Sequence, residues 1–79
     1  MYTVEFEHDA SIITTLDPTG EFSDVEVIIG DDSNVYLRQF DEDQGCYEMI
    51  IMSYTQFIQI FAALKSPEGA FKLEKRESK

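Results

Sequence analysis

Apolar and polar residues alternate along the first two thirds of the chain, in short segments separated by turn-forming residues. In residues 2–7 the sequence YTVEFE places Tyr2, Val4 and Phe6 on one side, and the threonine and glutamates on the other. A strict period of two predicts a half-buried strand. By similar patterns we expect four further strands, at residues 11–16, 25–29, 35–40 and 48–52.

The segments between these strands have the composition of turns. Asp17-Pro18-Thr19-Gly20 fits a type I turn, with Asp, Pro and Gly at the positions that each prefers. Residues 30–34, GDDSN, predict a second turn in which Gly30 and Asn34 can adopt positive φ. Residues 41–47 predict an acidic loop.

A helix is expected over residues 53–65, SYTQFIQIFAALK. Ser53 and Gln56 have the spacing of a capping box, in which each side chain bonds the backbone N–H of the other residue. Apolar side chains recur with helical spacing on one face, which predicts burial against the sheet. That set is Phe57, Ile60, Phe61 and Leu64. Lys65 suits the last turn, and Pro67 prevents the helix from continuing.

The helix carries a second apolar set on the adjoining face, namely Tyr54, Ile58 and Ala62. A surface helix usually has one apolar stripe and a polar back. Each large apolar side chain left in water forgoes roughly 1.5–3 kcal/mol. Two explanations remain open: a bent sheet or a C-terminal strand covers both faces, or two copies of the chain pack helix near helix. For the second explanation the predicted interface is Tyr54, Ile58, Phe61 and Ala62.

The element order predicts an α+β fold, with an antiparallel sheet of four to five strands followed by one helix. Residues 70–73 fit a short last strand, so residues 1–73 form one domain and residues 74–79 a charged tail. A domain of 79 residues is marginal without additional stabilisation. Cys46 is the single cysteine, which excludes an internal disulfide and leaves dimerisation as the common stabiliser.

The chain is strongly acidic, with a formal net charge of −10. Arg38 is the only Lys or Arg among residues 1–64. This balance argues against high-affinity polyanion binding, which depends on Lys and Arg at phosphates. The sequence has no signal-peptide pattern and no apolar run long enough to span a bilayer, so we expect a cytoplasmic protein. A lone cysteine fits a reducing compartment.

Catalytic, metal and cofactor motifs are not recognisable, so an enzyme is not expected. His8 and Cys46, the only His and Cys, lie far apart in sequence, and no orienting motif surrounds either. Counted from Asp41, the EF-hand positions for Gly and the bidentate Glu hold Cys46 and Met52, so that pattern fails. Ordinary acidic turns explain both Asp-rich segments, with an adventitious cation site as the alternative.

Arg38 lies mid-strand between Tyr36 and Phe40, on the same predicted face. Arginine and aromatic side chains together can form a stacking platform for single-stranded bases. The alternative is that Arg38 pairs with an acid across the sheet, such as Glu26, while Tyr36 and Phe40 join the core. A role in protein contact is the third possibility.

Residues 25–64 resemble the transcriptional coactivator family of positive cofactor four. The resemblance is carried by Arg38-Gln39-Phe40 on a strand, a loop and short strand, and the helix start at residues 53–57, SYTQF. It implies a four-stranded antiparallel sheet with a helix, a homodimer built through the helices, and single-stranded DNA lying across the strands. Tyr36, Arg38 and Phe40 fall on the matching DNA-facing positions. The chain departs from the family by carrying acids where its members carry bases on the early strands.

Two functional hypotheses follow. The first is a homodimeric, non-enzymatic interaction domain of coactivator-like fold that binds single-stranded nucleic acid through Tyr36, Arg38 and Phe40, as an accessory in transcription or replication. The second is an acidic module that mimics a polyanion or acts as a scaffold, and binds a basic protein partner. Small regulators of phage type often share this size and charge.

Overall fold

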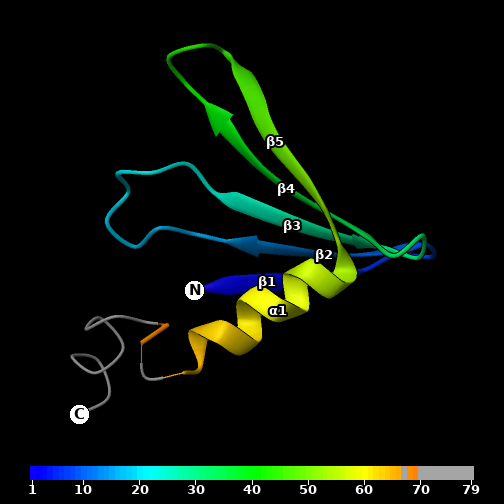
Figure 1. The fold of residues 1–79 in the computed structure, drawn as a ribbon. Helices are drawn as coiled ribbons and strands as arrows, with labels where there is room; N and C mark the ends of the chain where they lie inside the picture. The colour runs from blue at the N-terminus through cyan, green and yellow to red at the C-terminus, as the bar shows by residue number, and fades with distance from the viewer. Residues whose placement is uncertain (67, 70–79) are drawn as a thin grey trace.

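The computed structural model describes residues 1–66, 68 and 69, and they form an antiparallel five-stranded sheet followed by one helix (Figure 1). The α+β prediction is confirmed, with five strands where the coactivator resemblance implied four. The elements are β1 (Tyr2–Phe6), β2 (Ala10–Thr15), β3 (Val25–Gly30), β4 (Asn34–Asp41), β5 (Cys46–Ser53) and α1 (Tyr54–Leu64). The predicted strand at residues 70–73, the tail at 74–79 and Pro67 lie outside the described residues.

The strands form a meander in the order β1-β2-β3-β4-β5, so each pairs with the next along the chain. The registers place alternate residues of each strand on opposite faces of the sheet. One face carries a row of apolar residues that crosses every strand: Val4, Ile13, Val27, Leu37 and Ile50. The other carries the mixed row Thr3, Thr14, Glu26, Arg38 and Met49. The prediction that Tyr36, Arg38 and Phe40 share a face is confirmed.

Two turn predictions are wrong in detail. In the turn between β3 and β4, positive φ is adopted by Ser33, at 69°, and not by Gly30 or Asn34. The acidic loop is shorter than expected, because Cys46 and Tyr47 already pair with β4. Gly45 closes this tight turn with φ of 71°, and its N–H donates to the Asp41 carbonyl. A β-turn over residues 17–20 is confirmed by the hydrogen bond from the Gly20 N–H to the Asp17 carbonyl.

The helix begins as the sequence predicts. Ser53 is the N-cap, its hydroxyl accepts from the Gln56 N–H at 3.1 Å, and its own N–H donates to the Gln56 side chain at 3.1 Å. Lys65 is the C-cap, one position beyond the last turn in which it was expected. No helix in the described part of the chain is long and apolar enough to cross a membrane.

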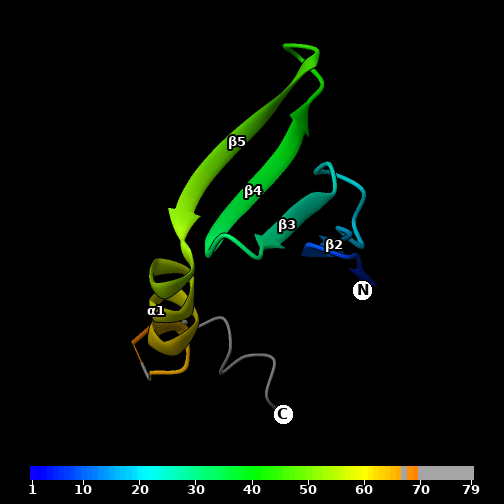
Figure 2. The same ribbon diagram turned by 90° about the vertical axis from the view of Figure 1, so that its right-hand side faces the viewer.

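α1 leaves the end of β5 and lies on one side of the sheet, where it contacts β4 and β5 (Figure 2). Val35 is the one buried side chain among the described residues, and it lies on the same face as Leu37 and the apolar row. We call this the helix-side face, and the face with Arg38 the open face. The prediction of a half-buried β1 is wrong, because every residue of β1 is exposed.

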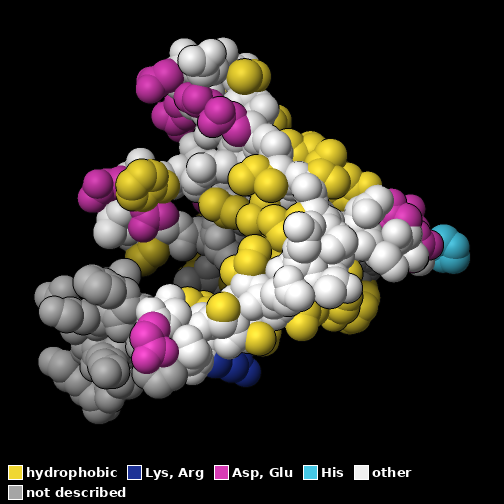
Figure 3. Space-filling view, in the orientation of Figure 1, with side chains coloured by type: hydrophobic (Ala, Val, Ile, Leu, Met, Phe, Trp, Pro, Cys, Tyr) yellow, Lys and Arg dark blue, Asp and Glu magenta, His cyan; other side chains and the backbone are white. Residues whose placement is uncertain are grey.

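The predicted core-facing stripe of α1 is also largely exposed. Only Phe57 is half-buried, whereas Ile60, Phe61 and Leu64 are exposed. Apolar side chains therefore reach the surface between α1 and the β4–β5 hairpin, while acidic side chains gather at the turns (Figure 3). Much of the apolar surface that drives folding elsewhere in proteins stays in water in this single chain.

Candidate functional site

Arg38 lies on the open face and is paired with an acid of its own chain. Its side chain forms an ion pair with Glu26, which stands directly across the β3–β4 ladder. The hydrogen bond to Glu26 raises the pKa of the guanidinium above its usual value. Both side chains are about one-third exposed. The cross-sheet pairing considered from the sequence is therefore the one that Arg38 adopts.

The same guanidinium lies over the ring of Tyr47, with the carbon at its centre 4.6 Å from the ring centroid. Phe40 meets Tyr47 edge to face across the β4–β5 ladder, at a centroid distance of 5.2 Å. Arg38, Phe40 and Tyr47 form one cluster, which we call the arginine–aromatic cluster. One ring face of Tyr47 is thus already occupied by a cation.

Tyr36 and Phe40 are not core residues, since Phe40 is 38% exposed and Tyr36 is half-buried. The Tyr36 hydroxyl donates to the Asp32 carboxylate at 3.2 Å, away from the cluster. Tyr47 is a member of this cluster that was not predicted, because residues 41–47 were expected to form a loop, whereas Tyr47 pairs with Phe40. The signal was present in Gly45, a residue that ends many short hairpin turns, and it places Tyr47 on β5 opposite Phe40.

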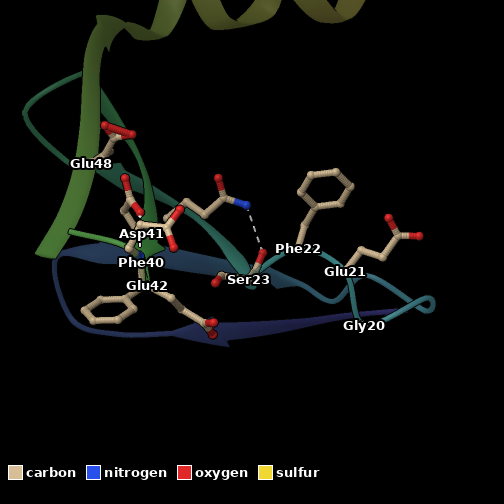
Figure 4. Close-up of a pocket in the computed structure, with 10 residues that line it drawn as sticks. Gly20, Glu21, Phe22, Ser23, Phe40, Asp41, Glu42 and Glu48 are labelled. Carbon is tan, nitrogen blue, oxygen red and sulfur yellow. Dashed lines mark hydrogen bonds between the residues drawn. The ribbon is translucent and has the colours of Figure 1, made fainter. Parts of the chain in front are cut away.

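A shallow depression lies where the β2–β3 loop approaches the β4–β5 hairpin (Figure 4). Figure 4 shows Glu48 projecting to the side on which α1 lies and Phe40 projecting to the other. The Gln39 side-chain amide donates to the Ser23 carbonyl at 2.9 Å and ties the loop to β4. The carboxylates that line this depression are Glu21, Asp41, Glu42, Asp43 and Glu48, with no Lys or Arg among the lining residues.

Asp17 and Asp32 organise turns, and hydrogen bonds lower the pKa of each carboxyl group. For Asp17, the main cause of the lowered pKa is the hydrogen bond that the Thr19 hydroxyl donates to its carboxylate. The same carboxylate also accepts hydrogen bonds from the backbone N–H groups of Glu21 and Phe22. The Asn34 N–H is the main cause for Asp32. A carboxylate whose charged form is stabilised in this way shapes a loop and is a poor proton acceptor.

The predicted interface residues of α1 are all exposed. Tyr54 is 45% exposed, Ile58 40% and Phe61 52%, and Ala62 is exposed as well. The strands of this chain do not cover them. The amino group of Lys65 lies over the Phe61 ring, 4.6 Å from its centroid.

His8 and Cys46 do not meet. His8 lies in the turn between β1 and β2, whereas Cys46 begins β5 at the opposite end of the sheet. Among residues 1–66, 68 and 69, no group of three or more His, Cys, Asp or Glu residues has the geometry to hold a metal ion.

Searches of curated proteins and of solved structures found no match to this chain. The resemblance to the coactivator family stays a prediction. A family model does match, and it covers residues 3–63, from β1 almost to the end of α1. The chain therefore belongs to the family described as "Domain of unknown function (DUF8831)".

Proposed function

We propose that this chain is a non-enzymatic interaction domain that binds a basic protein segment. The binding site would be the acidic depression between the β2–β3 loop and the β4–β5 hairpin. The observation that carries the proposal is the composition of that depression, whose lining includes five carboxylates and no Lys or Arg. The one base of residues 1–64, Arg38, is paired with Glu26.

Charge makes a basic partner the favoured one. The net charge of −10 attracts cations and repels phosphates over the range of the Debye length, about 8 Å at physiological salt. Electrostatic steering of this kind raises the association rate and gives a strong dependence on ionic strength. An extended segment rich in Lys or Arg has the charge and the slender side chains that an open, acidic depression can accept.

The test is fluorescence anisotropy with a labelled oligolysine peptide at low and at high salt. We expect binding that weakens steeply as salt rises. The double variant Glu42→Gln/Asp43→Asn removes two charges from the depression and should weaken binding at least several-fold. The charge-matched control is Asp9→Asn/Asp31→Asn, in the turns at the other end of the sheet, which should change binding much less. Equal loss in both variants would show only diffuse attraction and contradict a site at the depression.

Single-stranded nucleic acid is a second candidate, and the arginine–aromatic cluster is the observation that favours it. Arg38, Phe40 and Tyr47 combine the two side-chain types that stack on bases. The obstacle is Glu26, which neutralises the one cation, while Asp17, Asp24 and Glu42 line the same side. A strand of phosphates would have to displace Glu26 from Arg38.

Glu26→Gln offers a sharp test of this second function. The substitution releases Arg38 from its ion pair, so anisotropy with labelled oligo-dT should report tighter binding than for the natural chain. Arg38→Gln should abolish binding. If neither the natural chain nor Glu26→Gln binds at about 100 μM in low salt, within the range of ordinary non-specific affinities, this candidate is rejected.

A further inference from the structure

The helix-side face carries three cross-sheet rows of side chains, and their composition is unusual for a surface. The central row is apolar on every strand, and its ends, Val4 and Ile50, are 52% and 61% exposed. The row nearest the start of α1 runs Phe6, Ser11, Ile29, Val35 and Met52. The third row runs Tyr2, Thr15, Val25, Gln39 and Glu48. Glu48 is the one charged residue on the three rows.

α1 contacts β4 and β5 on this face and adds exposed apolar side chains of its own. At 100° per residue, the apolar side chains of α1 other than Ala63 occupy about 200° of the helix circumference, about twice the width of an ordinary core-facing stripe. Tyr54, Ile58 and Phe61 lie near the middle of this arc and are 40–52% exposed. No residue between Tyr54 and Leu64 is charged. Helix and sheet together therefore present one surface on which Glu48 is the single charged residue of the three rows and of α1.

Large apolar side chains stay exposed across this whole surface. Val4 and Phe6 on β1 are 52% and 89% exposed, Ile50 on β5 is 61% exposed, and Phe61 on α1 is 52% exposed. They extend from one edge of the sheet to the helix, and a specific interface needs a surface of about 800 Å² on each partner. Contiguous apolar patches of more than a few hundred Å² mark interaction surfaces.

We infer that a second copy of this chain covers the helix-side face, with β4, β5 and α1 of each copy packed against those of the other about a twofold axis. Charge favours this face as the place where two copies could meet. Two chains of net charge −10 repel each other, and the acids of each gather at its turns. The helix-side face is the surface on which two such chains can meet with few charges opposed. A basic partner would instead be drawn to the acidic turns.

A twofold arrangement also explains the two-faced helix. In an isologous interface the same patch is used on both subunits. The apolar helix and the apolar sheet of each copy can therefore both be buried against the other copy. Phe57 is the half-buried helix residue and faces its own chain. The exposed side of α1, with Ile58 and Phe61, would lie against the partner copy. This inference is independent of the proposed binding of a basic segment.

The first test is the mass of the full chain in solution, measured by light scattering and sedimentation. We expect a particle of about twice 9.1 kDa at about 100 μM, well above a micromolar dissociation constant. The melting temperature should rise with protein concentration, since association stabilises the folded state. A folded monomer at this concentration, with a melting temperature independent of concentration, would overturn the proposal and leave the face to another segment or partner.

The chain offers a matched pair of variants on β5. Ile50 and Ile51 are adjacent and equally exposed, at 61% and 62%, but they lie on opposite faces. Ile50→Glu and Ile58→Glu should raise the dissociation constant by more than about 100-fold, because each charge is buried twice in a symmetric interface. Ile51→Glu should leave the dimer intact. If Ile51→Glu dissociates the dimer as strongly as Ile50→Glu does, the helix-side face is not the interface.

A variant that fails to fold is also informative. If Ile50→Glu is unfolded by circular dichroism while Ile51→Glu is a folded dimer, folding depends on the helix-side face being covered. The concentration dependence of the natural chain's melting temperature then decides whether a second copy provides the cover. A spin label on Cys46 gives an independent readout, because a single preferred distance between two labels is expected in the dimer and none in a monomer.

Discussion

The two faces of the sheet manage exposure in different ways. On the open face, the polar groups find partners within the chain: Arg38 pairs with Glu26 and lies over Tyr47, and Tyr36 donates to Asp32. On the helix-side face, the apolar row that begins at Val4 is continuous, and both of its ends, Val4 and Ile50, are exposed. Arg38 is therefore paired within the chain, whereas much apolar surface on the other face is left uncovered.

Among the predictions that compare the two faces, the largest expected effect is on the free energy of unfolding when Val35, the one buried side chain of the described residues, is shortened. Val35→Ala removes two methyl groups at a fully buried site, and we expect a loss of about 2 kcal/mol in the free energy of unfolding, between the usual costs of Ile→Val and Leu→Ala. Urea unfolding followed by circular dichroism measures it. Val25→Ala, in a half-buried position at the edge of the same face, is the control and should cost clearly less. Equal losses in the two variants would mean that burial of Val35 contributes no more to stability than burial of Val25.

Removing the helix cap should come next. Ser53→Ala deletes the hydroxyl that accepts from the Gln56 N–H, at an expected cost of about 1 kcal/mol. Thr55→Ala, in the first turn and exposed, serves as the control. If α1 forms part of the dimer interface, Ser53→Ala should also raise the dissociation constant of the dimer. A lower free energy of unfolding with an unchanged dissociation constant would show that α1 is not part of the interface.

Breaking the ion pair on the open face should have a smaller effect than losing the cap, because exposed pairs are screened by solvent. A double-mutant cycle with Glu26→Gln and Arg38→Gln measures their coupling. We expect weak coupling that falls as salt is added and no change in oligomeric mass. A large coupling that does not depend on salt would indicate that the ion pair is shielded from solvent, in contrast to its exposure in the structure.

The smallest expected effect is on acid stability. The pKa values of Asp17 and Asp32 are lowered below 3.8 in the folded chain, so their contribution is present above the unfolded pKa and is lost as pH falls through the folded values. Stability should therefore decline below about pH 4. Asp17→Asn should flatten that decline, measured by thermal unfolding between pH 2 and pH 5. An unchanged slope would show that Asp17 does not contribute to it.

Local signals were sufficient to predict the order of the elements. Alternation located the strands, and the Ser53 and Gln56 spacing located the helix start within one residue. Alternation also predicted that Tyr36, Arg38 and Phe40 share a face. The ends of β4 and β5 were missed, because acidic residues mask a hairpin whose ladder is set by the Gly45 turn and by backbone pairing.

Burial was not predictable in the same way. Alternation shows which residues share a face, but the cover over that face depends on where the helix lies in three dimensions. The chain directs α1 from the end of β5 so that it contacts β4 and β5, and Val4 and Phe6 on the distant β1 remain exposed. The partner of Arg38 also required the β3–β4 register, which pairs it with Glu26.

The meander has a consequence for how the chain assembles in time. Since each strand pairs with its neighbour in sequence, every hairpin can form early and without a long loop to close, which favours rapid formation of the sheet. Covering the helix-side face would then require a second molecule to arrive by diffusion. Refolding should accordingly show two phases. The fast phase, formation of the sheet, should have a rate independent of protein concentration, and the slower phase, pairing of two chains, should have a rate that increases with it.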